Sequence, residues 1–193
     1  MTTDLPQKAC VFCNGYLKNL AKAKKAANDC DLLIAANGGA KYFLDIGLTP
    51  HVIIGDMDSI DLGIWANKTN IRYIQYRAEK DKSDTELAVE YALEQGCKQV
   101  ILLAATGGRM DHTLGNVALL AAYPGRIAIL DDNDTLVAVD KSEKCVLNGN
   151  IGTTVSLIPY GVGPLVIRTT GLRYPLQDQS LQLYCLSWKW TNP

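Results

Sequence analysis

The sequence has no excess of basic charge and no long apolar run. Its 193 residues include 19 lysines and arginines against 20 aspartates and glutamates, for a net charge of −1. A general nucleic-acid binder needs a basic surface, so this balance argues against that class. The longest apolar run, residues 117–123, is far shorter than the roughly 18 residues that a membrane-spanning helix needs. We therefore expect no nucleic-acid partner and no membrane partner.

Several catalytic signatures are also missing. The sequence contains no Walker G-x-x-x-x-G-K-[ST] motif, no G-x-S-x-G nucleophile elbow, no H-E-x-x-H pair and no protein-kinase signature. It contains only two histidines, which are too few for a histidine-rich metal site. A phosphate-handling enzyme built from this chain would have to use carboxylates, glycine turns and arginine.

The amino-terminal segment has neither the basic region nor the apolar region of a secretory signal. We therefore expect a cytoplasmic protein whose six cysteines are reduced. Cys10 and Cys13 have the spacing of a redox motif, but they fall inside a predicted strand. Buried small hydrophobic side chains are the favoured interpretation of these cysteines, with redox or zinc chemistry as the alternative.

Strand and helix patterns alternate along the first two thirds of the chain. Strands are expected at residues 8–14, 31–36, 51–55, 71–76, 100–105 and 126–130. Helices are expected at residues 19–28, 40–46, 83–95 and 113–123. Ser83 and Glu86 have the spacing of a capping box, and Gly47 and Gly96 follow predicted helix ends. This alternation predicts a mostly parallel, Rossmann-like α/β domain over residues 1–132.

The remainder of the chain shows short strand patterns separated by turn residues. Strands are expected at residues 135–140, 144–147, 153–159, 165–170 and 181–186. This pattern predicts a small all-β sandwich domain over residues 133–193. About 60 residues are few for an independent sandwich, so we expect this domain to pack against the first domain or against a partner chain.

Polar residues gather where the predicted parallel strands end, and open α/β sheets bind ligands beyond that edge. Asp56 and Asp58 follow the strand at residues 51–55 directly. Carboxylates two residues apart in extended backbone face the same way and repel each other unless a cation lies between them. Mg²⁺ is the usual cation for such a pair, and a solvated turn is the alternative interpretation.

Three further clusters lie at the same predicted edge. Asn37, Gly38, Gly39 and Ala40 form either an anion-binding turn before a helix or an ordinary tight turn. Asp81, Lys82 and Asp84 precede or open the helix at residues 83–95, where they either serve a metal and phosphates or only suit the helix dipole.

The last cluster runs from Thr106 to His112, with Asn116 one turn into the next helix. Two glycines followed by an arginine and a helix start are typical of a phosphate cradle. Arg109 would bind phosphate oxygens bidentately, and Asp111 and His112 would orient a nucleotide.

Taken in order, these motifs resemble those of the thiamine pyrophosphokinase family, over residues 11–186. The five segments that carry the resemblance are Asn37-Gly-Gly-Ala40, Gly55-Asp-Met-Asp-Ser-Ile60, Lys80-Asp-Lys-Ser-Asp-Thr-Glu-Leu-Ala88, Gly107-Gly-Arg-Met-Asp-His112 with Asn116, and Thr170-Gly-Leu-Arg-Tyr-Pro-Leu176. Each segment is weak by itself, but five in this order are specific.

The resemblance implies transfer of a pyrophosphoryl group from ATP to the hydroxyethyl oxygen of thiamine, which gives thiamine diphosphate and AMP. It implies an amino-terminal α/β domain for ATP and Mg²⁺ and a carboxy-terminal β-sandwich that helps to bind thiamine. It also implies a homodimer whose active sites are shared between subunits.

Residue roles follow from the same match. The implied magnesium ligands are Asp56, Asp58 and Asp84. The implied ATP contacts are Asn37, Gly38, Gly39, Ala40, Gly107, Gly108, Arg109, Asp111, His112 and Asn116. The residues implied in catalysis are Asp58, Asp84, Arg109 and Asp111, with Asp58 or Asp84 as candidates to help deprotonate the thiamine hydroxyl. Thr170 and Ser187 are implied in thiamine binding.

The sequence departs from the family pattern at three places. Asn37 stands where the family often has aspartate, and Ser83 stands where threonine is more common. Ser187 is followed by Trp188 and Lys189 instead of asparagine and glutamate, which predicts a shortened carboxy-terminal domain. Two other hypotheses therefore stay open: a related pyrophosphokinase for another heterocyclic alcohol such as a pterin, and a non-catalytic nucleotide-binding protein.

Overall fold

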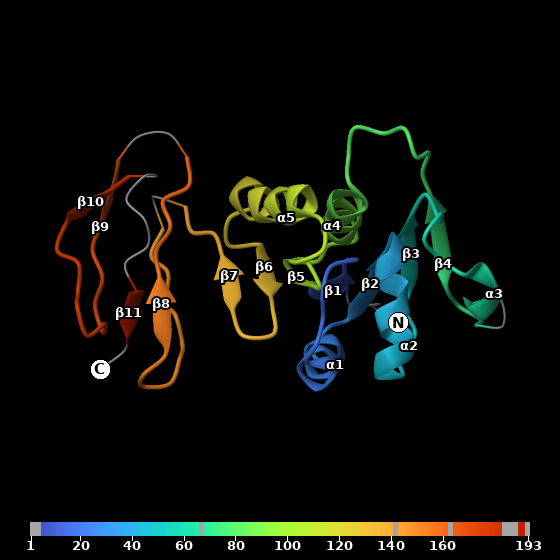
Figure 1. Ribbon diagram of the computed structural model, residues 1–193, viewed down its shortest axis with the longest axis horizontal. Helices are drawn as coiled ribbons and strands as arrows, with labels where there is room; N and C mark the ends of the chain where they lie inside the picture. The colour runs from blue at the N-terminus through green and yellow to red at the C-terminus, as the bar shows by residue number, and fades with distance from the viewer. Residues whose placement is uncertain (1–4, 66–67, 141–142, 162–163, 183–188, 192–193) are drawn as a thin grey trace. The chain divides into compact units, whose positions relative to one another are not determined.

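The computed structural model describes residues 5–65, 68–140, 143–161, 164–182 and 189–191 (Figure 1). The chain divides into two compact units, Met1–Ala138 and Val139–Pro193. Each unit is described by itself.

A seven-stranded sheet forms the centre of the first unit. Its strands are β1 (Lys8–Phe12), β2 (Leu32–Ala36), β3 (Val52–Gly55), β4 (Arg72–Gln75), β5 (Gln99–Leu103), β6 (Ile127–Leu130) and β7 (Thr135–Val137). They are arranged in the order β4-β3-β2-β1-β5-β6-β7. Strands β1 to β6 run parallel, and β7 pairs antiparallel with β6. The mostly parallel α/β fold predicted from the sequence is confirmed.

Helices cover both faces of this sheet (Figure 1). The helical elements are α1 (Leu20–Asn28), η1 (Asn37–Ala40), α2 (Lys41–Ile46), α3 (Leu62–Trp65), α4 (Asp84–Glu94) and α5 (Met110–Ala122). Buried residues of α1 and α2 belong to one hydrophobic cluster, and buried residues of α4 and α5 belong to the other. The sheet is therefore doubly wound.

The central strand β1 supplies side chains to both clusters. Ala9 and Val11 pack on the α4–α5 side, whereas Cys10 and Phe12 pack on the α1–α2 side, and all four are fully buried. The rings of Phe12 and Phe43 have centroids 4.5 Å apart. Burial on both faces explains why the strands read as continuous apolar runs.

The helix ends form as their sequences predict. Asn19 caps α1, because its side chain accepts a hydrogen bond from the Lys22 amide at 3.0 Å. Ser83 caps α4 in the same way, with the Glu86 amide as donor at 3.1 Å. Gly47 follows α2 in the left-handed conformation, with φ of 67°. The Asn19 and Ser83 side chains satisfy amide groups that a helix start leaves without intrahelical partners.

Three elements of the first unit differ from the sequence prediction. Helix α5 begins at Met110 rather than at residue 113, so the motif that follows β5 runs into the first turn of the helix. The strand expected at residues 135–140 forms over Thr135–Val137, and it extends the first sheet through β6. The short helix α3 was not predicted, although its Trp65 is buried in the core.

The described residues of the second unit contain two antiparallel pairs of strands. Strand β8 (Thr154–Ser156) pairs with β11 (Lys189–Thr191), and β9 (Leu165–Ile167) pairs with β10 (Gln179–Leu181). The strand expected at residues 144–147 is wrong, because this exposed segment forms no regular element. Most of the strand expected at residues 181–186 lies outside the described residues.

The prediction of buried cysteines is confirmed for Cys10, Cys13 and Cys97, whereas Cys30 is partly buried and Cys145 is exposed. Cys10 and Cys13 are buried and free, and they pack in different hydrophobic clusters. Because they lie on opposite faces of the sheet, their side chains do not form a redox pair. Burial raises the pKa of the Cys13 thiol to about 12, so it stays protonated at neutral pH. Over the described part of the chain, none of the helices has both the length and the apolar character to cross a membrane.

The chain reverses its direction of winding at β1. From this strand, β2, β3 and β4 are added on one side, and β5, β6 and β7 on the other. Ligands of open α/β sheets bind beyond the carboxyl ends of the strands where the strand order reverses. The loops after β1 and β5 therefore hold the position at which a ligand is expected.

Candidate active site

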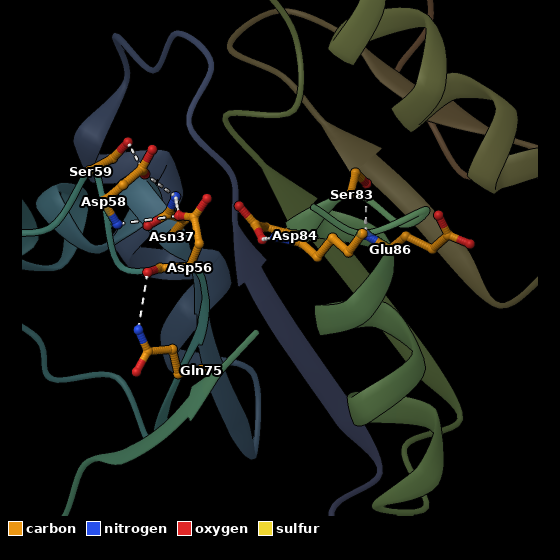
Figure 2. A network of polar contacts seen from close by, with 9 residues as sticks. Asn37, Asp56, Asp58, Ser59, Gln75, Ser83, Asp84 and Glu86 are labelled. Atoms are coloured by element: carbon orange, nitrogen blue, oxygen red, sulfur yellow. Dashed lines mark hydrogen bonds and ion pairs between the residues drawn. The ribbon is translucent and has the colours of Figure 1, made fainter. Parts of the chain in front are cut away.

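A buried asparagine amide lies between two carboxylates at the end of β3 (Figure 2). Asn37 opens η1 directly after β2, and its Nδ2 donates to Asp56 Oδ1 at 2.8 Å and to Asp58 Oδ1 at 2.9 Å. Asn37 is only 8% exposed. Its φ of 44° is in the left-handed region, which asparagine tolerates better than most residues. The turn after β2 is thus shaped to present this amide to the acids after β3.

The Asn37 amide offsets the repulsion between Asp56 and Asp58, for which a cation was expected from the sequence. Two carboxylates at this separation repel each other, and both Asn37 N–H groups are directed at them. The amide orientation follows, because the opposite orientation would place a carbonyl oxygen against two anions. As a result, Asn37 Oδ1 is buried and accepts no hydrogen bond.

Asp58 receives further hydrogen bonds that favour its charged form. Besides Asn37, the Ser59 hydroxyl donates to Asp58 Oδ1 at 2.8 Å. These two hydrogen bonds, with Asn37 as the larger cause, lower the pKa of Asp58 below its usual value. Met57, between the two acids, has φ of 68°, an uncommon conformation for a residue with a long side chain. Strained backbone of this kind is frequent at functional sites.

The third predicted acid comes from the other side of the sheet. Asp84 is the first residue of α4, and Figure 2 shows its carboxylate pointing toward the side of the site that holds Asp56. Lys80 Nζ lies 2.9 Å from Asp84 Oδ1, and both side chains are mostly buried. This oxygen makes the ion pair but receives no directed hydrogen bond. Sequence reasoning did not assign Lys80 a role, although its spacing of four residues from Asp84 is a pairing signal.

The glycines after Asn37 are explained by packing on β1. Gly38, Gly39 and Ala40 are buried. A Cβ atom on Gly39 would lie 2.0 Å from the Phe12 carbonyl oxygen, and one on Gly38 would meet the Asn14 side chain at 2.6 Å. Close approach to the Phe12 backbone therefore accounts for Gly39, and the neighbouring Asn14 side chain accounts for Gly38, while any contact of these glycines with ATP remains a prediction.

The motif after β5 presents an arginine that is already held by an acid. Gly107 and Gly108 have φ of 78° and 69°, so the tight turn requires glycine at both positions. Arg109 donates to Asp111 through Nε at 3.1 Å and Nη2 at 2.5 Å, and both side chains are largely exposed. The Arg109 hydrogen bond is the main reason why the pKa of Asp111 falls to about 2. Asp111 thus fixes the plane of a guanidinium that solvent can reach.

Residues of the α4 and α5 motifs meet at a small cavity. It has a volume of about 220 Å³ and is lined by Ser83, Asp111, His112, Gly115 and Asn116. Asn116 is buried, and its Nδ2 donates to the Ala105 carbonyl at 2.8 Å. This contact ties α5 to the end of β5, so the Asn116 amide has a structural partner. Thr170 is exposed in the second unit, and Ser187 lies outside the described residues.

The donor set at the end of β3 fits a hard divalent cation. Among the described residues, no three histidine, cysteine, aspartate or glutamate side chains come close enough to form a complete metal site. Mg²⁺ does not require one, because it is commonly bound through one or two carboxylates together with phosphate oxygens and water. Asp56 and Asp58 supply two carboxylates, and Asp84, whose Oδ1 is paired with Lys80, is the third acid of the predicted set.

These features define a doubly wound α/β protein with an acidic, phosphate-type site at the carboxyl edge of its sheet. The catalytic-domain model of thiamin pyrophosphokinase matches residues 23–130, and the vitamin B1 binding domain model of the same enzyme matches residues 136–188. The chain belongs to the thiamine pyrophosphokinase family, as its motif order predicts.

Individual relatives agree with this assignment. A thiamine pyrophosphokinase of Bacillus subtilis is 30% identical over 165 residues, which cover 79% of this chain and 73% of that protein. Thiamine pyrophosphokinase 1 of Oryza sativa subsp. japonica is 30% identical over 177 residues, covering 78% and 67%. The crystal structure of thiamine pyrophosphokinase from Bacillus subtilis superposes with a TM-score of 0.79 at 25% identity, covering 96% of this chain and 90% of that one.

Replacement of Gly39 by alanine tests the packing role of the motif glycines. We expect Gly39→Ala to lower the free energy of unfolding by about 3 kcal/mol or more, because the new methyl group meets rigid backbone. The matched change Gly115→Ala adds a methyl group in open space within α5 and should stabilise by about 0.5–1 kcal/mol. Urea denaturation followed by circular dichroism measures both. Equal stability of Gly39→Ala and the parent chain would refute this account.

Replacement of Asn37 by aspartate tests the bridging amide. Asn37→Asp places three carboxylates together, so in EDTA we expect the free energy of unfolding to fall by about 1–3 kcal/mol. Millimolar Mg²⁺ should restore part of this loss, since a cation would replace the lost donors. Asn70→Asp, at an exposed turn position with φ of 75°, is the matched control and should change little. An Asn37→Asp chain as stable in EDTA as the control would contradict the role of the amide.

Proposed function

We propose that this chain transfers the pyrophosphoryl group of ATP to the hydroxyethyl oxygen of thiamine, forming thiamine diphosphate and AMP. The observation that carries the proposal is the Asp56–Asp58 pair, which Asn37 bridges at the carboxyl edge of the sheet. This part of the chain matches the catalytic domain of the family. The hydrogen bonds from Asn37 keep the two carboxylates close together without a cation. The match of the second unit to a vitamin B1 binding domain supports thiamine as the acceptor.

We further propose Mg²⁺ as the metal, with Asp56, Asp58 and Asp84 as its protein ligands. When bound, Mg²⁺ would screen the triphosphate and stabilise the charge that develops on the transferred group and on AMP. The lowered pKa of Asp58 suits this assignment, because a metal ligand must be ionised. The same lowered pKa makes Asp58 a poor general base, since a base works best with a pKa near the operating pH.

Two cationic side chains would meet the phosphates in this proposal. Arg109 is exposed, and Asp111 holds its guanidinium in one plane while leaving other N–H donors for phosphate oxygens. Lys80 lies beside Asp84, where it would balance the charge of the acid and of a phosphate together. Positioning and electrostatic stabilisation of this kind supply most of the catalysis in phosphoryl-type transfer. Asp84 is the other acid that we propose as the acceptor of the hydroxyl proton.

The activity assay measures AMP formed from ATP and Mg²⁺, with and without thiamine, and with EDTA as a metal control. We expect AMP only when thiamine and metal are both present. Asp58→Asn and Asp84→Asn should each lower kcat/KM at least about 100-fold, because each removes charge that contacts the metal. Asp29→Asn removes the same charge from an exposed position at the end of α1 and should leave activity unchanged.

The other outcomes of this assay decide between the alternatives. AMP formed with a hydroxymethyl pterin but not with thiamine would assign a different acceptor. Nucleotide binding without any AMP would indicate a non-catalytic nucleotide-binding protein. Full activity in both Asp58→Asn and Asp84→Asn, with the fold intact by circular dichroism, would overturn the metal assignment.

We also propose a homodimer whose subunits share the active sites, located in the cytoplasm, where the buried thiols Cys10 and Cys13 would stay reduced. The second unit supports the dimer, because many of its large apolar side chains are exposed in the single chain. They include Val146, Leu147, Ile151, Ile158, Tyr160 and Val166. Exposed apolar area of this extent is typical of a surface that a partner covers.

Sedimentation velocity tests the dimer. We expect a species of twice the 21.0 kDa chain mass at micromolar concentration. Val166→Asp places a charge on an exposed apolar position of β9 and should shift the distribution toward the monomer. A parent chain that stays monomeric at every concentration tested would contradict the proposal.

A further inference from the structure

Two thiols lie together on the α1–α2 side of the first sheet, where the chain passes from α1 into β2. Cys10 is fully buried in the middle of β1, and Cys30 is partly buried in the turn between α1 and β2. Cys30 packs against the same hydrophobic cluster that contains Cys10. The two side chains are close enough for the Cys10 thiol to donate a hydrogen bond to the Cys30 sulfur. The acidic site at the carboxyl edge includes neither of them.

We infer that Cys30 and Cys10 form a reversible disulfide when the protein meets a hydroperoxide. Cys30 reacts first in this scheme, because it is the thiol of the pair that solvent can reach. Cys10 is the resolving thiol, because it is buried beside the Cys30 sulfur. In the cytoplasm proposed above, the two thiols are the resting state, and the disulfide forms only while peroxide is present. The inference goes beyond pyrophosphoryl transfer and does not depend on it.

The backbone fixes the position of Cys30 against β1. On one side of it, the Asp31 amide donates to the Lys8 carbonyl at 2.9 Å, and the Lys8 amide donates to Asp31 Oδ2 at 3.0 Å. On the other side, the Cys30 amide donates to the Ala27 carbonyl at 3.1 Å. The Cys30 thiol itself donates to the Ala26 carbonyl at 3.2 Å, at the end of α1. The turn is therefore tied both to β1 and to α1, which keeps the sulfur of Cys30 beside the strand.

The other described cysteines are less well placed to pair with Cys30. Cys13 and Cys97 belong to the hydrophobic cluster on the opposite face of the sheet. Cys145 lies in the second unit. Among the described residues, Cys10 is therefore the cysteine that shares a face of the sheet with Cys30.

The surroundings of the pair make Cys30 the more reactive thiol. The hydrogen bond from Cys10 is the main reason why the pKa of Cys30 is lowered, and the Lys8 ammonium adds to this effect. Burial and the carboxylates of Asp29 and Asp31 oppose it. Burial raises the pKa of Cys10 well above its usual value, so Cys10 stays protonated and can donate the hydrogen bond. Because the thiolate is the nucleophile, attack on a peroxide begins at Cys30.

The reaction takes place in two steps and consumes one hydrogen peroxide. The Cys30 thiolate attacks one peroxide oxygen, the O–O bond breaks, and the departing hydroxide takes up the proton that the thiol had released. The resulting sulfenic acid is attacked by the Cys10 sulfur, so the S–O bond breaks and the S–S bond forms. The Cys10 proton leaves with the hydroxide as a second water. The two thiols together lose two electrons to the peroxide, and a dithiol reductant reverses the change.

Peroxide oxidation of the folded chain, followed by mass spectrometry, tests the inference. The reduced chain is treated with hydrogen peroxide, blocked with N-ethylmaleimide and digested with trypsin without reduction. We expect the peptide of residues 9–18, which contains Cys10, to be joined to the peptide of residues 26–41, which contains Cys30. Dithiothreitol added before digestion should abolish the joined peptide.

Single-cysteine variants identify the partner and the order of the steps. Cys30→Ser should abolish the joined peptide, whereas Cys145→Ser, which removes an exposed thiol, is the matched control and should retain it. Cys10→Ala should stop the reaction at the sulfenic acid, so that dimedone labels Cys30. Cys13→Ala should retain the joined peptide, which assigns the bond within residues 9–18 to Cys10.

The parent chain decides the test even where a variant fails to fold. Absence of the joined peptide from the oxidised parent chain would overturn the inference. A bond from residues 26–41 to residues 83–98, the peptide of Cys97, would overturn the assignment of Cys10, and so would a joined peptide that persists in Cys10→Ala. Because neither nucleotide nor thiamine is added, the result is independent of the activity assay.

Discussion

Close contact between backbones at the carboxyl end of β1 is the constraint on which both the Asn37 turn and the Gly107–Arg109 turn depend. On one side, Gly39 lies so near the Phe12 carbonyl that no side chain fits between them. On the other side, a Cβ atom on Gly15 would lie 2.2 Å from the Thr106 carbonyl oxygen. The first contact sets the turn that carries Asn37, and the second sets the loop that leads to Gly107. A shift of β1 would therefore move the carboxylate bridge and the arginine turn together.

The electrostatic arrangement follows from this packing. Asn37 can bridge Asp56 and Asp58 only because its turn is pressed against β1 and its amide is screened from water. Lys80 similarly offsets the charge of Asp84. The acids are thus neutralised in part before a cation arrives, which lets two carboxylates stay ionised and close together. Hydrogen bonds in a partly buried site are strong enough to hold such a pair.

The sequence alone was enough to predict the parallel sheet, most helix ends and the clustering of polar residues at one edge. Alternating apolar runs and local signals such as the Ser83 cap carry that information within a few residues. The partner of Asn37 lies 19 residues away, so no local pattern reports that its amide bridges two acids. The close approach of Gly15 to the Thr106 carbonyl in the same way joins two loops that lie about ninety residues apart in the chain.

Two of the sequence predictions were wrong for two different physical reasons. Residues 144–147 have the composition of a strand, but a strand needs a partner, and this segment pairs with none of the described strands. Residues 110–112 follow two glycines and an arginine, a pattern typical of a loop, yet the helix already begins at Met110, after Arg109 in extended conformation. Tertiary pairing decides the first case and backbone geometry after two left-handed glycines decides the second, and neither is visible in composition.

Asparagine at position 37 has a consequence for the chemistry that aspartate would not have. An aspartate there would need a cation to hold the three acids together, so metal binding and assembly of the site would be one event. The Asn37 amide instead holds Asp56 and Asp58 in place without metal, so the free energy of cation binding is not spent on overcoming their repulsion. Compared with aspartate, the neutral Asn37 also leaves the site with one negative charge less, which weakens the electrostatic attraction for the cation. Preorganisation and reduced charge therefore act in opposite directions on metal affinity, and their balance is set by a single side chain.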